Sequence, residues 1–285
     1  MSHDLLKSVP ELTIKCLDHG FVRLHDCMPR LAPTERTAEY AIVQSARISY
    51  NLGLKSVDED NNLVKYLIRN SHTSPLENVK FTFHIKCPKF VTIQFLRHRC
   101  SNVNEFSQRY AELPKDEYYS LLNQCNDIVS IRGNNKTNKQ GSDKLRENED
   151  VIKEEIGNME KLMSQVFEGY HKLIKLGLAK ELSRNYLPMG TYTEMYYTMD
   201  LNNLLKFLKL RLDNHAQAEI SVYAEAMLKL ITPIVPVVIE IFKDQLTGTF
   251  LCGKESDAIS NKTKLDTTSK SEMDEFEKKK KLLNI

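Results

Sequence analysis

The sequence has 285 residues, of which 27% are charged and 41% hydrophobic, with a formal net charge of +2. These values are ordinary for a globular protein and allow one large domain or two small ones. A charge so close to balance gives no global field that would draw the protein to nucleic acid or to a membrane. We find no apolar run near the roughly 20 residues that cross a bilayer. The N-terminal segment contains acidic residues and no uninterrupted apolar core, so we do not expect it to be a secretory signal.

Cysteine and glycine usage narrows the possible chemistry. Six cysteines are scattered without a CxxC pair, which predicts neither a zinc ribbon nor a disulfide framework, and we assign no metal ligands. We therefore expect a reducing, cytoplasmic compartment. Ten glycines form neither a GxGxxG nor a GxxxxGKS/T motif, so the phosphates of a bound nucleotide would have to be held by side chains.

In the first part of the chain, strand patterns alternate with two short helices. The apolar segment before Pro29 predicts a strand. A helix is expected over residues 35–50, with Thr34 as its N-cap, and a second one over 61–70. Residues 71–78 contain turn-forming residues and predict a polar loop.

Residues 79–87 carry the clearest strand pattern, because apolar and polar side chains alternate along them. A proline follows this strand and begins a helix expected over 88–99. On that helix Gln94 and Arg97 share one face, whereas His98 lies on an apolar one. We therefore expect His98 to be a packed or orienting residue.

Long helices dominate the second half of the chain. Residues 126–150, rich in Asn, Lys and Gly, predict a polar surface insertion. An amphipathic pattern predicts a helix over 151–176 that ends at Gly177, followed by a short helical segment over 180–185. A third long helix is expected to run from an N-cap at Asp200 to Leu230. Its spacing would place three polar side chains on one face: Arg211, His215 and Glu219.

Together these elements predict an α+β fold. We expect a single domain over residues 1–253, in which a central mixed or antiparallel sheet is flanked by long helices. Residues 254–285 are low in hydrophobicity and end in a lysine-rich segment. This composition predicts a charged and mobile C-terminal tail.

A cluster of cations between residues 97 and 110 is the strongest functional feature. It holds three arginines and one histidine but no lysine. Arginine is suited to forked hydrogen bonding with phosphate or carboxylate, so one interpretation is an anion-binding site. The alternative is a partly buried ion-pair network in which Glu105 pairs with Arg99 or Arg109. Composition alone leaves both interpretations open.

The same residues resemble the motif of a known family. Arg97-His98-Arg99, seven further residues and then Ser107 match the RHRx7S motif of the flavin-dependent thymidylate synthases. Two later segments, 184–188 and 208–220, resemble other characteristic blocks of that family. The resemblance extends roughly over residues 34–250.

The resemblance implies a fold and a reaction. Members of the family convert dUMP to dTMP, taking a one-carbon unit from 5,10-methylenetetrahydrofolate and a hydride from FAD that NADPH has reduced. They are homotetramers whose active sites combine residues of different subunits. The resemblance therefore implies dUMP, FAD, NADPH and folate as ligands, and neither a membrane nor a nucleic-acid partner.

The resemblance also implies the site residues. Those expected to contact dUMP are Gln94, Phe95, Leu96, Arg97, Glu105, Phe106, Ser107, Gln108, Arg109, Arg184 and Arg211. Those expected to contact FAD are His72, Ser74, Arg97, His98, Arg99, Glu105, Asp200, Leu201, Asn202 and Lys206. Arg211 and Ser107 form the expected catalytic set. The fixed charge of Arg211 would stabilise negative charge at the N3/O4 edge of the uracil, and we interpret Ser107 as a hydrogen-bonding ligand rather than a nucleophile.

Four positions depart from the family pattern. Asn78 stands where a further histidine is frequent, Asp200 and Asn202 stand where Asn and Arg are common, and Lys206 replaces a usual Asn or His. All four fall on the flavin or folate side of the expected site. The alternative function is accordingly an anion-binding or nucleic-acid-binding scaffold that has lost flavin chemistry.

Overall fold

The computed structural model describes residues 2–115, 117–124, 131–134, 142–144, 148–213 and 215–247, with a few further residues between 258 and 281. The chain divides into two compact units, Met1–Val238 and Ile239–Ile285. Most of the expected insertion 126–150 and most of the expected tail 254–285 lie outside the described residues. The domain boundary at residue 253 stays a prediction.

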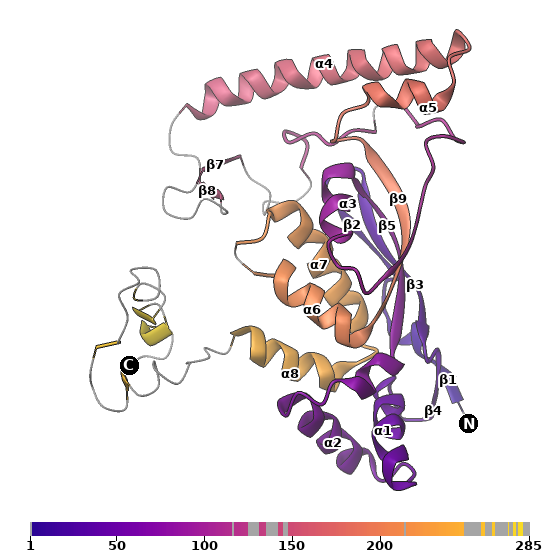
Figure 1. Cartoon of the computed structure of the whole chain (residues 1–285), viewed down its shortest axis with the longest axis vertical. Helices are drawn as coiled ribbons and strands as arrows, with labels where there is room; N and C mark the ends of the chain where they lie inside the picture. The colour runs from indigo at the N-terminus through magenta and orange to yellow at the C-terminus, as the bar shows by residue number, and fades with distance from the viewer. Residues whose placement is uncertain are drawn as a thin grey trace. The chain divides into compact units, whose positions relative to one another are not determined.

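The centre of the first unit is an antiparallel sheet of five strands (Figure 1). Its order is β2 (Thr13–Cys16), β3 (Gly20–Met28), β5 (Lys80–Pro88), β9 (Tyr192–Asp200) and β6 (Asn102–Glu105). Every neighbouring pair is antiparallel, which confirms the expected central sheet. β3 and β5 match the two strands predicted from the sequence, whereas β6 and β9 have no counterpart among the predicted elements.

One face of this sheet carries the core. On β5 the alternating pattern buries Phe81, Phe83, Ile85 and Cys87. Three helices pack on this face: α3 (Lys89–Phe95), α6 (Leu201–Arg211) and α7 (Ala218–Ile231). Phe95 of α3 packs against the sheet and both other helices. Its ring centroid lies 5.3 Å from that of Tyr197 on β9, 5.1 Å from Phe207 on α6 and 6.2 Å from Tyr223 on α7.

The first two helices differ from the prediction at their starts. α1 spans Glu39–Arg47 and continues as the 3-10 turn η2 (Ile48–Tyr50). Thr34 is not its N-cap, because Ala38 occupies that position and makes no side-chain capping bond. α2 spans Val57–Arg69, so it begins four residues earlier than expected. A capping box between Ser56 and Glu59 fixes that start, since each side chain bonds the other's backbone.

The prediction of a third long helix is wrong, because α6 ends at Arg211 and α7 begins only at Ala218. Asp200 does cap α6, its Oδ1 accepting the Asn203 backbone N–H at 3.0 Å. The side chain of Asp213 then accepts the backbone N–H of His215 at 2.8 Å, a local bond that competes with helix formation. Consequently Arg211, His215 and Glu219 do not share one helical face.

The other elements lie around this framework. The expected helices over 151–176 and 180–185 are confirmed as α4 (Glu149–Lys175) and as α5 (Lys180–Ser183) with η4 (Arg184–Tyr186). The short elements are β1 (Ser2–Asp4), η1 (Leu5–Ser8), β4 (Leu31–Pro33), η3 (Ser74–Asn78), β7 (Arg132–Asn134) and β8 (Ser142–Lys144). α8 spans Pro236–Thr247. Among the residues described, no helix has the length and apolar character to span a bilayer.

Candidate active site

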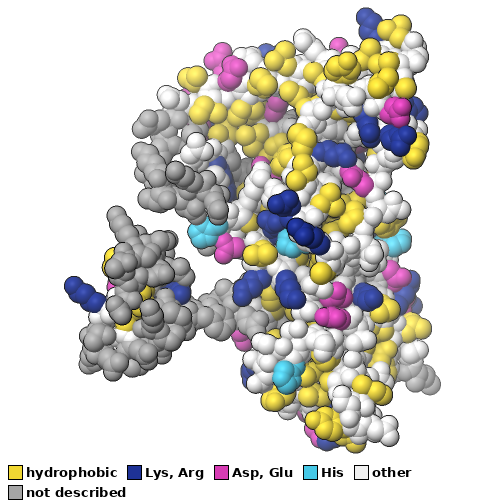
Figure 2. Space-filling view, in the orientation of Figure 1, with side chains coloured by type: hydrophobic (Ala, Val, Ile, Leu, Met, Phe, Trp, Pro, Cys, Tyr) yellow, Lys and Arg dark blue, Asp and Glu magenta, His cyan; other side chains and the backbone are white. Residues whose placement is uncertain are grey.

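The arginine cluster begins where α3 ends. α3 is shorter than predicted and stops at Phe95, with Leu96 as its C-cap. Arg97 and Arg99 follow on the surface, and within the described residues neither guanidinium has an ion-pair or hydrogen-bond partner. Figure 2 shows Lys and Arg side chains gathered with a histidine near the middle of one face of the molecule.

The expected ion-pair alternative is wrong in its pairing. Glu105 pairs with Lys89 and accepts a hydrogen bond from the Thr193 hydroxyl at 2.8 Å. Arg109 instead pairs with Glu181 of α5 at 3.2 Å. Arg99 therefore has no carboxylate partner within the described part of the chain. Arg97 and Arg99 thus keep their positive charge unpaired within the described residues, as an anion-binding site requires.

Arg211, the last residue of α6, reaches back to the end of α3. Its Nε donates to Nε2 of His98 at 3.1 Å, and its Nη2 donates to the backbone carbonyl of Gln94 at 3.3 Å. The Gln94 side chain is itself tied to Gln217, in the loop before α7, at 2.8 Å. Burial lowers the pKa of Arg211, yet a guanidinium stays charged under all ordinary conditions. Arg211 is thus a half-buried cation held by neutral groups.

His98 fits the predicted orienting position. Its ring meets the Phe207 ring edge-on at 4.8 Å, and it accepts the Arg211 hydrogen bond. Burial, and then the charge of Arg211, lower the pKa of His98. The imidazole is therefore neutral near pH 7.

The segment after β6 contains Ser107. The backbone N–H of Phe106 donates to the Glu194 carbonyl at 2.8 Å, which anchors the segment to β9. The Ser107 Oγ accepts the Arg109 backbone N–H at 3.4 Å. Within the described residues no histidine or lysine contacts the Ser107 hydroxyl, so nothing there activates a nucleophile. Gln108 is buried.

The Arg184 segment lies beside residues 109 and 110. Lys180 of α5 donates to the Tyr110 carbonyl at 3.1 Å, and Glu181 holds Arg109. Arg184 begins η4, immediately after α5. The fold thus brings the segment of Arg184 to that of Ser107, while no contact among the described residues joins Arg184 to Arg211.

A second group of predicted residues lines a recess between α1, α2 and η3. The recess has a volume of about 1060 Å³, and its walls include His72, Ser74, Tyr66 and Asn78. The exposed His72 ring meets the Tyr66 ring edge-on at 6.1 Å. This size lies at the upper end of the range for small-molecule pockets, so the recess can accept part of a large planar ligand.

Three of the four departures from the family pattern make bonds within the chain. Asp200 caps α6. Asn202 is buried and donates to Glu77 at 3.1 Å, joining α6 to η3. Asn78 donates to the Ser45 hydroxyl at 2.8 Å. Lys206 is exposed on α6.

Two of the predicted contact residues are core side chains. Phe95 and Leu201 are both fully buried, so only their backbone atoms remain for a ligand. Sequence reasoning missed Tyr197, whose ring packs beside Phe95 and whose buried hydroxyl has no hydrogen-bond partner among the described residues. The alternating apolar residues of β9 were the signal that would have found it.

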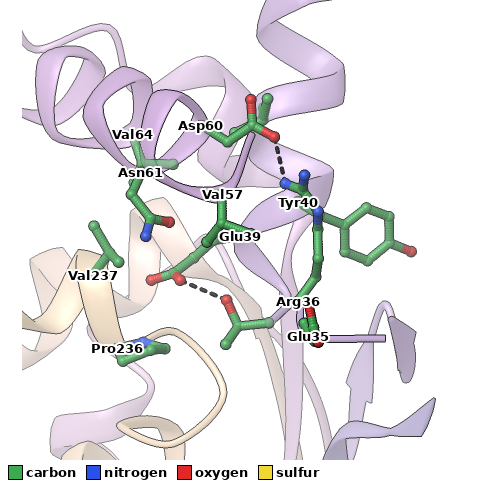
Figure 3. A pocket seen from close by; sticks show the side chains of 12 residues that line it. Glu35, Arg36, Glu39, Tyr40, Val57, Asp60, Asn61, Val64, Pro236 and Val237 are labelled. Atoms are coloured by element: carbon green, nitrogen blue, oxygen red, sulfur yellow. Dashed lines mark hydrogen bonds and ion pairs between the residues drawn. The ribbon is translucent and has the colours of Figure 1, made fainter. Parts of the chain in front are cut away.

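A smaller concavity between α1 and α2 is structural rather than functional. Its volume is about 90 Å³, too small for a nucleotide. Figure 3 shows Arg36 reaching Asp60 in this concavity. The Thr37 hydroxyl donates to the Glu39 carboxylate at 2.6 Å. Asp60 also pairs with Arg47 at 2.5 Å, so one buried carboxylate pairs with two arginines.

Comparison with known proteins identifies the family of this chain. Residues 30–237 match the family model described as thymidylate synthase complementing protein. A flavin-dependent thymidylate synthase of Dictyostelium discoideum is 43% identical over 282 residues, covering 99% of this chain and 90% of that protein. One of Treponema denticola is 42% identical over 248 residues, covering 87% of this chain and 88% of that protein.

A solved structure points the same way. The UMP/dUMP methylase PolB from Streptomyces cacaoi, bound with 5-Br dUMP, superposes with a TM-score of 0.65 and 27% identity, covering 81% of this chain and 97% of PolB. The motif around Ser107, the sheet with its helices and the extent of these matches agree. The chain belongs to the flavin-dependent thymidylate synthase family.

Proposed function

We propose that the protein is a flavin-dependent thymidylate synthase, which converts dUMP to dTMP by reductive methylation with FAD as its cofactor. The observation that best supports this proposal is the environment of the Arg211 side chain. A half-buried guanidinium is held there by the neutral His98 ring and the Gln94 carbonyl. Because both partners are neutral, the positive charge of Arg211 is available to a ligand. A reaction that builds negative charge on a pyrimidine requires such a charge.

The arginines have separate tasks in the proposed mechanism. The dUMP phosphate carries about −1.5 to −2 charges at pH 7, and Arg97 and Arg109 are the cations of the expected phosphate contact. Arg211 would stabilise negative charge at the N3/O4 edge of the uracil while the C5 proton leaves and the new carbon bond forms. The Ser107 hydroxyl would donate a hydrogen bond that orients the nucleotide.

The residues present fit a flavin dinucleotide. The recess beside His72 and Ser74 is large enough for part of it, and Arg97 and Arg99 carry no carboxylate that would compete with its pyrophosphate within the described residues. When bound, FAD supplies the hydride chemistry. The chain's own groups would bind and orient the ligands: His72, Ser74, Arg97, Arg99 and Lys206.

The remaining ligands belong to the same proposal. We infer 5,10-methylenetetrahydrofolate as the carbon donor and NADPH as the reductant from the family resemblance, and we assign no residues to either. The catalytic domain would span residues 1–253. Cys16, Cys27, Cys87 and Cys100 form no disulfide, which supports a reducing, cytoplasmic compartment.

We further infer a homotetramer with shared sites. On α4 the apolar side chains of Val151 and Leu162 are 66% and 50% exposed, although an amphipathic helix normally covers its apolar stripe. On the outer sheet face, the exposed Tyr196 ring stacks on His84 with centroids 4.9 Å apart. Subunit contacts would cover such surfaces. Light scattering on the purified protein tests the assembly state.

One preparation tests the proposed function. The purified protein should be yellow, and it should release the uracil C5 hydrogen only with NADPH and methylenetetrahydrofolate both present. A colourless protein that stays inactive with added FAD would overturn the proposal. Binding to DNA that falls steeply with salt would then favour the scaffold alternative.

A further inference from the structure

The contact between Arg211 and His98 fixes more than a distance. Arg211 Nε always carries a hydrogen and can only donate. Since it donates to Nε2 of His98 at 3.1 Å, that ring nitrogen must be the acceptor. An acceptor nitrogen is unprotonated, so the ring proton lies on Nδ1. The geometry thus selects one tautomer of one protonation state.

The same contact sets the direction of the guanidinium. An arginine has five N–H donors in a planar fork. One of them points at His98 and one at the Gln94 carbonyl, which leaves three for a ligand. Two fixed donors on a flat group determine its plane, so the remaining three are pre-aimed before any ligand arrives.

Both acceptors are neutral, and this matters for the charge. A carboxylate in either place would hold Arg211 more firmly but would cancel much of its field. A neutral histidine binds the guanidinium more weakly than a carboxylate would, but it does not cancel the positive charge of Arg211. The histidine can act in this way only as the neutral imidazole, because a protonated ring would donate from Nε2 and repel the guanidinium.

We propose that His98 is a positioning residue for Arg211, acting as the neutral imidazole with its proton on Nδ1. The assignment rests on the proposed function for its kinetic consequences, but the tautomer and the contact can be tested without turnover. It adds to the flavin contact expected for this histidine a separate duty on the dUMP side of the site.

The groups around His98 agree on the sign of its pH dependence. The charged or titratable ones are Arg211 on α6, Arg97 and Arg99 beside it in the chain, and Tyr197 on β9. Burial raises the pKa of Tyr197 to about 12, so its hydroxyl is neutral. Burial, and then the charge of Arg211, disfavour a protonated ring. The contact is therefore present at neutral pH and is lost as pH falls through the lowered pKa of His98, below its ordinary value near 6.5.

Two substitutions separate positioning from packing. In H98Q the amide oxygen can accept the Arg211 hydrogen bond but does not titrate, whereas H98L fills the space with no acceptor. We expect kcat of H98L to fall roughly 10- to 100-fold, the usual effect of losing a hydrogen bond to a charged group, and H98Q to recover most of that loss, because its amide oxygen restores an acceptor for Arg211. The acid limb of the wild-type kcat profile should vanish in H98Q. As a matched control, H3Q removes an exposed histidine on β1 and should leave the profile unchanged.

Flavin absorbance and titration calorimetry with dUMP distinguish the expected flavin contact of His98 from its proposed positioning of Arg211. Positioning predicts that H98L retains FAD better than it retains turnover. Equal kcat values for H98Q and H98L, or a loss of FAD that accounts for the whole loss of turnover, would overturn the proposal.

Nitrogen NMR of the full chain with labelled histidine needs no substrate. It should show His98 protonated on Nδ1, with a pKa that rises towards 6.5 in R211M. Protonation on Nε2, or an unchanged pKa in R211M, would overturn the proposal. If the wild-type protein neither binds dUMP nor turns over, the proposed function fails, and this measurement still decides the inference about His98.

Discussion

Two groups of arginines in this molecule have opposite surroundings. Between α1 and α2, Arg36 and Arg47 both reach the buried carboxylate of Asp60, and Arg47 also donates to the Gly53 carbonyl at 3.0 Å. Around α3, Arg97 and Arg99 have no carboxylate partner within the described residues, and Arg211 is held by neutral groups. The first group holds two helices and a loop together, whereas we propose that the second binds a ligand.

The contrast teaches that the partner of an arginine, and not its burial, indicates its use. Arg47 is buried and Arg211 is half-buried, so both are partly removed from water. A buried charge is stable only when something offsets its desolvation. For Arg47 the offset comes from Asp60, while Arg211 has only dipoles and therefore gains from an incoming anion.

The largest expected effect comes from removing the carboxylate of the first group. Asp60→Ala leaves Arg36 and Arg47 without their buried partner, which typically lowers the free energy of unfolding by about 3–5 kcal/mol. For a chain of this size the melting temperature should fall by on the order of 10 °C. Calorimetry on the purified protein measures the shift. Asp58→Ala, at an exposed position on α2, is the control and should melt near wild type, while an equal shift in both variants would contradict the assignment.

The next effect comes from removing the central member of the second group. Arg211→Ala should lower kcat by roughly 10²–10³-fold, the range for removing one donor that stabilises developing charge. FAD binding should change much less, and the melting temperature should hold or rise, because a half-buried cation without a carboxylate partner contributes little to folding. Steady-state kinetics with flavin absorbance separates these outcomes. Arg97→Ala should instead weaken both ligands, so similar small effects of the two substitutions would argue against these assignments.

The fold was predictable where the pattern is periodic over many residues. The alternation in β5 and the apolar stripe of α4 fixed those elements closely. The break between α6 and α7 was not predictable from periodicity, since the apolar spacing continues through it. Just after the end of α6 the Asp213 side chain accepts the backbone N–H of His215, and hydrophobic spacing carries no information about such a bond.

The sequence could propose members of the site but not their contacts. By its resemblance to the family, the RHRx7S motif pointed to Arg97, His98 and Ser107, and a later block pointed to Arg211; their roles at the site stay predictions. That Arg211 would bond to His98 depends on how α6 lies against α3, a tertiary relation that sequence spacing does not contain. The pairing of Glu105 with Lys89 was missed for the same reason, because the nearby arginines were the obvious candidates.

A smaller effect tests whether a departure from the family pattern is structural. Asp200→Ala removes the N-cap of α6, which should cost about 1 kcal/mol of stability. Asp200→Asn keeps a capping oxygen and should recover most of that loss. If the carboxylate serves only the helix, FAD affinity should be the same in both variants. Urea unfolding and flavin titration provide the two measurements, and a lower FAD affinity in the Asn variant would place Asp200 in the flavin site.

The smallest effect concerns Arg109, which has a carboxylate partner like the first group but belongs to the cluster of the second. Arg109 pairs with Glu181 at 3.2 Å, but both side chains are about half exposed. An exposed pair contributes roughly 0–1 kcal/mol, so Glu181→Ala should barely change the melting temperature. Because the substitution removes a competitor for the Arg109 guanidinium, dUMP should bind up to about threefold more tightly at low salt, and the gain should shrink as salt screens the charges. Calorimetry at two salt concentrations measures both the melting temperature and the affinity for dUMP. The control is Glu154→Ala, at an exposed position on α4. Weaker dUMP binding in Glu181→Ala would mean that Glu181 orients Arg109 for the phosphate, which would give this surface pair the same duty that we infer for His98.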